Sequence, residues 1–167
     1  SIRVAGDEID EQIADYCRSV HSLLIGERTA EACKIAIGSA FPGLQEQTAI
    51  VRGRNLQTGL PQQVELTSSQ IREAISAPTT EIVENIKMAI EATPPELLAD
   101  VMEHGIYLAG GGALLGGLDK RIEQEADIPV HIADNPLEAV VRGTGACLHN
   151  LEAFREVFVS ENATPYG

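Results

Sequence analysis

The stretch Ile106-Tyr107-Leu108-Ala109-Gly110-Gly111-Gly112-Ala113-Leu114-Leu115 decides the fold of this chain. Its four apolar residues, 106–109, predict a buried strand that runs directly into three consecutive glycines. Because glycine has no Cβ, the backbone there can take left-handed angles and lie directly against a flat ligand. Ligands of open α/β sheets bind at the carboxyl ends of strands. The pattern therefore predicts either a nucleotide-binding turn or a tight turn that needs glycine only for its conformation.

Helices and strands are expected to alternate on both sides of this turn. A helix start at Thr93-Pro94-Pro95-Glu96, with Thr93 as N-cap, predicts a helix that reaches His104, and Gly105 suits its end. The order that follows is a strand at 106–109, a helix at 118–126, a strand at 130–132 and a helix at 137–149. Strands that alternate with helices indicate parallel pairing through right-handed crossovers.

The first half of the chain predicts a different organisation. Apolar spacing predicts helices over 9–20, 29–38 and 82–90, a hairpin of 49–51 with 64–66, and a short helix that begins at a Thr67/Gln70 capping box and ends before Pro78. We therefore expect residues 1–26 and 94–150 to share one α/β sheet as a larger subdomain. Residues 27–93 would form an inserted α+β subdomain, and residues 151–167 a flexible tail.

Composition excludes several functions. The 167 residues carry a net charge of −13, so a phosphate backbone would be repelled and nucleic-acid binding is not expected. No apolar run is long enough to cross a bilayer. The three cysteines are far apart and are expected to be buried, reduced thiols, and the four histidines show no metal-binding spacing. The first residue is not methionine, which suggests a fragment or a processed product.

A second candidate site lies on the helix near residue 31. Glu31 and Lys34 are three residues apart and share one face, and Gly38 lies one turn further on. An acceptor, a donor and a patch without a side chain would suit the sugar and edge of an adenosine. The alternative is a surface ion pair between Glu31 and Lys34, which would contribute about 0.3 kcal/mol to stability.

Several motifs occur together in an order that resembles the MreB family of bacterial actins. They are Gly26-Glu27-Arg28-Thr29-Ala30-Glu31, Arg52-Gly53-Arg54-Asn55, Thr58-Gly59-Leu60-Pro61, Thr93-Pro94-Pro95-Glu96-Leu97, Gly110-Gly111-Gly112-Ala113-Leu114-Leu115 and Ile128-Pro129-Val130. The resemblance covers residues 1–150 and matches the C-terminal half of that family. It implies an actin-like, ribonuclease H-like fold with a parallel or mixed sheet flanked by helices.

The resemblance also implies an ATP site and its residues. The family's adenosine motif corresponds to Gly110, Gly111, Gly112 and Ala113. Related chaperone ATPases use an E-x-x-K helix at the adenosine, which Glu31 and Lys34 match, with Gly38 following them. One departure is Leu115-Gly116-Gly117-Leu118, where an extra glycine replaces a longer polar residue and is expected to loosen the helix start.

The family's phosphate loops, catalytic groups and magnesium ligands are expected upstream of Ser1. No catalytic or metal-binding residue is therefore predicted here. A full-length protein would be a slow Mg-ATP-dependent ATPase, whereas this chain would bind ATP weakly at best. The resemblance further implies self-association into filaments, contact with the cell-wall elongation machinery, and a cytoplasmic location at the inner membrane face, without direct lipid contact from this half.

Two alternatives stay open at this point. A small-molecule kinase or chaperone-type ATPase of the same superfamily would use a similar glycine turn, although the insert is short for a kinase lid. An interaction module without a nucleotide would use the glycines only as a turn and leave Glu31 and Lys34 on the surface.

Overall fold

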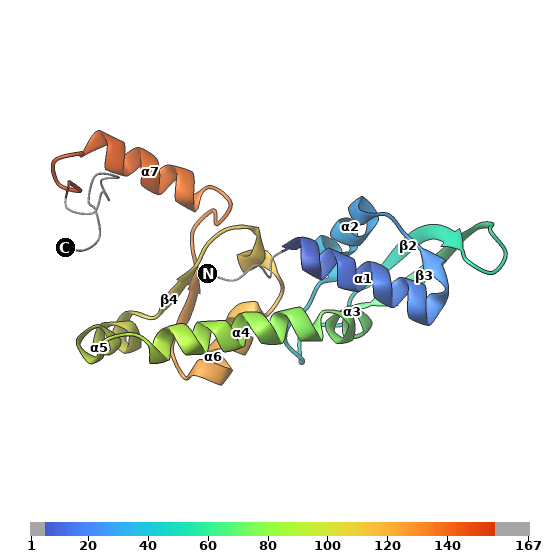
Figure 1. The fold of residues 1–167 in the computed structure, drawn as a ribbon, viewed down its shortest axis with the longest axis horizontal. Coiled ribbons are helices and arrows are strands. Elements are labelled where there is room, and N and C mark those ends of the chain that lie inside the picture. Colours follow the sequence, from blue (N-terminus) through green and yellow to red (C-terminus); the bar gives the residue numbers. More distant parts are fainter. Residues whose placement is uncertain (1–5, 156–167) are drawn as a thin grey trace, which may run out of the picture.

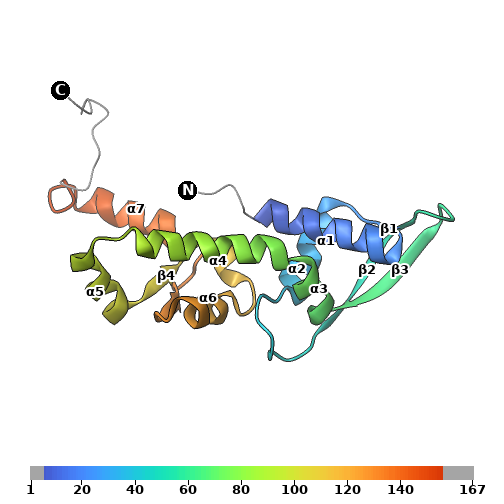
Figure 2. The same ribbon diagram turned by 60° about the horizontal axis from the view of Figure 1, so that its bottom comes forward.

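Helices and strands alternate through residues 6–155, which is the part of the chain that the computed structural model describes (Figure 1). The elements are α1 (Gly6–His21), β1 (Leu23–Leu24), α2 (Glu27–Ile37), β2 (Thr48–Asn55), β3 (Pro61–Thr67), α3 (Ser68–Ala74), α4 (Ser76–Glu91), α5 (Pro95–His104), β4 (Ile106–Leu108), the 3₁₀ helix η1 (Gly111–Leu114), α6 (Leu118–Ala126), β5 (Val130–Ile132) and α7 (Ala139–His149). The molecule is elongated, and α4 runs lengthwise between its two ends (Figures 1 and 2).

The first sheet is antiparallel, in the order β1-β2-β3. Val51 pairs with Val64 and Ala49 with Leu66, which confirms the predicted hairpin. Residues of β2 alternate between the two faces, as a half-buried strand requires. Val51 is therefore buried while its neighbours Ile50 and Arg52 are exposed. The hairpin projects at one end of the molecule (Figure 2).

The second sheet is the parallel pair of β4 and β5, in which Ile106 lies opposite Val130 and Leu108 opposite Ile132. Helix α6 connects the two strands and packs against β5. The predicted parallel pairing is thus confirmed, and α6 and β5 have the predicted bounds. Helix α5 lies at the end of the molecule opposite the hairpin (Figures 1 and 2).

The expectation that residues 1–26 share a sheet with 94–150 stays a prediction, because residues 1–5 lie outside the described residues, whereas β1 belongs to the antiparallel sheet. Leu23 and Leu24 of β1 pair with Asn55 and Arg54 of β2, and α1 packs against α2. This pairing buries Leu23 completely. A two-residue strand carries no periodicity that a sequence pattern could detect. The division into a larger and an inserted subdomain remains a prediction, as does the tail, most of which lies outside the described residues.

Two helix starts differ from the prediction. Helix α3 ends at Ala74, before Pro78 as predicted, but α4 begins at Ser76 and not near 82. Pro78 lies in the first turn of α4, where an amide has no intrahelical acceptor to lose. Helix α5 begins at Pro95 with Pro94 as its N-cap, and the Thr93 hydroxyl donates to the carbonyl of Ala89, 2.8 Å away. The capping box of Thr67 and Gln70 is present as predicted.

One apolar core extends from α1 to α6. It includes Ile13 of α1, Leu66 of β3, Val83 of α4 and Ile122 of α6, none of which is exposed. Burial of each such side chain contributes about 1.5–3 kcal/mol. By contrast, neither α5 nor α7 buries any residue. None of the helices between residues 6 and 155 combines the length and apolar composition needed to cross a membrane.

The three cysteines differ in their surroundings. Cys17 and Cys33 are buried in the core, as predicted, whereas Cys147 on α7 is half-buried, and all three are free thiols. Burial raises the pKa of Cys17 and of Cys33 to about 11, the nearby Cys17 sulfur adding to the effect at Cys33. Only the thiolate is nucleophilic.

We expect a thiol reagent at about pH 8 to modify Cys147 rapidly and the two buried thiols only after unfolding, because roughly one molecule in a thousand carries a thiolate three pH units below its pKa. Mass spectrometry of the labelled protein over time checks this. Equal labelling rates at Cys17, Cys33 and Cys147 in the folded protein would contradict the burial described here.

Candidate nucleotide site

The glycine turn after β4 is open to solvent. Gly110 caps the turn with φ 83° and ψ 178°, and its amide donates to the carbonyl of Pro136 at 2.7 Å. The chain then forms η1, in which Gly111 and Gly112 are exposed and the Ala113 side chain faces the interior. A ligand could therefore reach the bare backbone at 111 and 112.

Conformation alone explains only one of the three glycines. The angles of Gly110 lie in a region that is essentially restricted to glycine. A Cβ on Gly112 would have no neighbour within 4 Å, and one on Gly111 would make an ordinary contact with Leu137 Cδ2 at 3.6 Å. The fold therefore has room for side chains at 111 and 112. Their absence favours a binding turn over a purely conformational one.

A mostly apolar cavity of about 270 Å³ lies against the turn. Leu108, Ala109, Gly112 and Ala113 form one wall, Gly6 and Ile9 of α1 another, and apolar side chains of α4 and α6 the remainder. Its size is slightly below the roughly 300–1,000 Å³ of typical ligand pockets. An apolar, glycine-lined wall of this kind suits the face of a flat ring.

Backbone contacts join the end of α2 to the turn region. Ser39 and Gly116 form a parallel β-bridge, and the Ala40 amide donates to the Gly116 carbonyl at 2.7 Å. A Cβ on Gly38 would lie 2.3 Å from the Lys34 carbonyl oxygen and 2.9 Å from Leu115 Cδ1. Gly38 is therefore required for close approach. These contacts bring the two predicted site segments together.

Lys34 points toward the start of α1. Its Nζ donates to Asp10 Oδ2 at 2.8 Å and to the Gly6 carbonyl oxygen at 3.1 Å. The pair is largely buried, with side-chain exposures of 18% for Lys34 and 5% for Asp10. Because Gly6 also lines the cavity beside the turn, Lys34 is linked to the wall of that cavity by its hydrogen bond to Gly6. The expected alternative of a surface Glu31–Lys34 pair is not formed.

Glu31 is exposed and does not line the cavity beside the turn. The structure thus brings Lys34, Gly38 and the four turn residues 110–113 into one region, and leaves Glu31 on the outer surface of α2. Its role in binding a sugar stays a prediction.

Asp10 and Gly6, which contact Lys34, are not predicted as site residues by any pattern in the sequence. Asp10 Oδ1 is buried and has no hydrogen-bond partner, so the carboxylate can accept one more bond. The available signal was an acidic residue adjacent to Ile9 and one turn before Ile13, on the apolar side of an amphipathic helix. Carboxylates at such positions are rarely buried without a partner.

The glycine pair at 116–117 has a steric role. Gly117 has φ 74°, and a Cβ there would lie 2.6 Å from Phe41 Cβ. A Cβ on Gly116 would lie 2.8 Å from the Gly38 carbonyl oxygen. The pair therefore permits the close approach of residues 38–41, and α6 begins immediately afterwards at Leu118.

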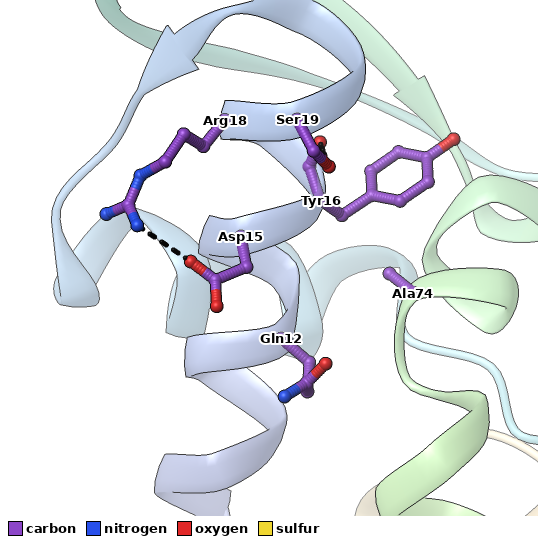
Figure 3. Close-up of a pocket in the computed structure, with 6 residues that line it drawn as sticks. All are labelled: Gln12, Asp15, Tyr16, Arg18, Ser19 and Ala74. Atoms are coloured by element: carbon purple, nitrogen blue, oxygen red, sulfur yellow. Dashed lines mark hydrogen bonds and ion pairs between the residues drawn. The ribbon is translucent and has the colours of Figure 1, made fainter.

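Two other cavities are lined by different residues. A cavity of about 370 Å³ lies between α1 and Ala74 of α3, where Tyr16 and the exposed Arg18–Asp15 pair are found (Figure 3). Another, of about 500 Å³, is lined by Asp7, Glu8, Asp10, Glu11, Ala14 and Glu27, and its negative charge would repel a phosphate. Within residues 6–155, no three acidic, histidine or cysteine side chains converge to hold a metal ion.

Comparison with known proteins identifies the family. Residues 1–156 match the family model described as MreB/Mbl protein. The chain belongs to the MreB/Mbl family. Over 152 residues it is 46% identical to the cell shape-determining protein MreB of Escherichia coli K12. The aligned region covers 91% of this chain and 44% of that protein. It is 44% identical to the cell shape-determining protein Mbl of Bacillus cereus, with 91% and 46% covered.

Solved structures agree with this membership. MreB5 of Spiroplasma citri bound to ADP superposes with a TM-score of 0.86 at 34% identity, over 93% of this chain and 47% of MreB5. The AMPPNP-bound form of MreB5 gives the same score. The MamK double helical filament, 22% identical with a TM-score of 0.66, shares the fold. The predicted actin-like fold is thus confirmed, and this MreB/Mbl chain spans about half the length of its relatives.

Proposed function

We propose that this chain forms the adenosine-facing wall of a nucleotide site in a cell shape-determining protein that self-associates into filaments. The observation that carries the proposal is the open glycine ribbon at 111–112, beside a cavity and joined to α2 through Ser39 and Gly116. Nucleotide-bound MreB5 supports ATP as the ligand, and the filament of MamK supports self-association.

In this proposal the chain supplies recognition and no chemistry. The backbone of Gly111 and Gly112 would lie against the base and ribose, and Lys34 would hold the adjacent start of α1 through Gly6 and Asp10. Groups that bind magnesium and activate water would come from other parts of a longer protein. The names of the relatives support a role in cell shape over the small-molecule kinase alternative. We further propose that the longer protein acts at the inner membrane face with the wall-elongation machinery.

Hydrogen exchange with and without millimolar ATP tests this function on the longer protein that contains these residues. We expect ATP to slow exchange in segments 108–114 and 31–38, because bound nucleotide would cover the turn and restrain the end of α2. Unchanged exchange in both segments at saturating ATP would reject the proposed site. GTP and ADP, compared at the same concentration, would define which part of the nucleotide is recognised.

A further inference from the structure

A polar cavity of about 300 Å³ lies where α3, α4 and α6 meet the loop that follows α2. Its volume is at the lower end of the roughly 300–1,000 Å³ of ligand pockets. Neither Lys34 nor residues 110–113 line it, so it is separate from the candidate nucleotide site. The lining of this arginine cavity includes Phe41 and Pro42 of the loop, Arg72 of α3, Ser76 of α4, and Arg121 and Glu125 of α6.

Arg121 is held in place by three hydrogen bonds. Its Nη1 donates to Thr79 Oγ1 and its Nη2 to Thr80 Oγ1, both at 2.7 Å. Its Nε donates to Glu125 Oε1 at 3.1 Å, and the side chain is only 19% exposed. Two of these three acceptors are neutral hydroxyls, so most of the positive charge is not compensated by them. Because the guanidinium is already fixed, a ligand would lose little affinity in ordering it.

Arg72 is oriented by a neutral partner. Its Nε and Nη2 donate to Ser39 Oγ at 3.4 and 3.2 Å, and the Ser39 hydroxyl donates to the Phe41 carbonyl at 3.0 Å. Arg72 forms no ion pair within residues 6–155. Hydrogen bonds from Ser69 and, to a smaller extent, the charge of Arg72 lower the pKa of Glu46, which lies outside the cavity lining. The lining thus carries two guanidinium groups and one carboxylate, in a chain of net charge −13.

The remaining donors of the two arginines suit a phosphate group. A guanidinium has five N–H donors. The bonds found within residues 6–155 use two on Arg72 and three on Arg121, which leaves three and two available. The exposed Ser76 adds a hydroxyl. A phosphate group presents three strong acceptor oxygens and a carboxylate only two, so this set of donors fits a phosphate better.

We propose that the arginine cavity binds a small phosphomonoester, with its phosphate at Arg72 and Arg121 and its organic part against Phe41 and Pro42. Such a ligand would connect α3, which follows the hairpin directly, to α6, which packs beside α4 (Figures 1 and 2). It would therefore tie the antiparallel sheet to the parallel pair at a second point, apart from the glycine turn. The site does not depend on the nucleotide proposed above.

Calorimetric titration of the longer protein that contains these residues tests the site, with phenyl phosphate as the probe. The probe joins a phosphate to a flat ring, which suits Phe41 and Pro42. We expect saturable binding of one probe per chain at millimolar concentration. In hydrogen exchange, the probe should protect segments 39–42, 71–76 and 121–125 and leave 108–114 unchanged. Protection of 108–114 instead would place the probe on the glycine turn and overturn the proposal.

Three variants make the titration specific. Arg72→Met removes one guanidinium and should weaken binding at least about tenfold. Gln124→Glu adds negative charge at an exposed position of the lining, removes no packing, and should also weaken binding. Lys120→Met is the matched control, because it removes one positive charge from an exposed position of α6 outside the lining and should leave the affinity unchanged. Circular dichroism confirms that each variant is folded.

Benzoate, titrated at the same concentration, tests the preference for phosphate and should bind more weakly than phenyl phosphate. The proposal is overturned if the unmodified protein shows no saturable binding, or if Arg72→Met or Gln124→Glu binds the probe as tightly as the unmodified protein does. Equal losses in Lys120→Met and Arg72→Met would show only a general attraction of anions and would overturn the site. Equal affinity for benzoate and phenyl phosphate would overturn the assignment of the ligand.

Discussion

Replacement of Lys34 by methionine is expected to lower the free energy of unfolding by about 3 kcal/mol, because it leaves Asp10 buried without its counter-ion. Asp10 is only 4% exposed and already has one oxygen without a partner, so it cannot recover the lost bond from water. For a chain of this size the change corresponds to a fall in Tm of roughly 10 °C. Urea or thermal unfolding followed by circular dichroism measures it.

Two further variants make this experiment specific. Arg18→Met breaks the exposed pair with Asp15, whose side chains are 56% and 51% exposed, and should cost less than about 1 kcal/mol. The double variant Asp10→Leu/Lys34→Met removes both charges and should recover most of the stability lost by Lys34→Met alone. If Lys34→Met were no more destabilising than Arg18→Met, the buried pair would not contribute as described.

Replacement of Gly112 by valine is expected to abolish ATP protection of segments 108–114 and 31–38 while leaving the fold intact. A side chain at 112 has no protein neighbour within 4 Å, so it would occupy the space proposed for the nucleoside. We expect ATP affinity to fall at least about tenfold, which corresponds to 1.4 kcal/mol. Hydrogen exchange and thermal unfolding of the same sample separate binding from stability.

Gly26→Val is the matched control for Gly112→Val. A Cβ on Gly26 also has no neighbour within 4 Å, and Gly26 lies at the exposed start of α2 with an ordinary φ of −87°. The same added volume there should leave ATP protection unchanged. Undiminished protection in Gly112→Val would show that nucleotide does not contact the ribbon.

Local patterns in the sequence predict most of this fold. Regular apolar spacing locates α6, β5 and the hairpin pairs, because each of these elements buries one face against its neighbours. The Thr67 capping box locates the start of α3, because it depends only on residues 67–70. The prediction fails where the determinant is tertiary. β1 is too short to show a period, and only its hydrogen bonds to β2 place it in the first sheet.

The candidate site likewise has one part that local sequence patterns predict and another that depends on tertiary contacts. The glycine triplet can be recognised in the sequence as a candidate binding turn. In the structure, packing does not require glycine at 111 or 112. The sequence points to Lys34 through its spacing from Glu31, yet the partner of Lys34 is Asp10, 24 residues earlier in the chain. No local pattern gives such a pairing, since it depends on how α1 crosses α2.

The backbone of residues 38–40 contacts the backbone of Gly116 directly. No side chain lies between the two segments to adjust to a displacement. Any shift of the ribbon after β4 must therefore carry α2 with it. Since α2 packs on β2, such a shift would also reorient the antiparallel sheet. Under the proposed function, a nucleotide bound at the ribbon would therefore change the position of the β2–β3 hairpin in the same molecule.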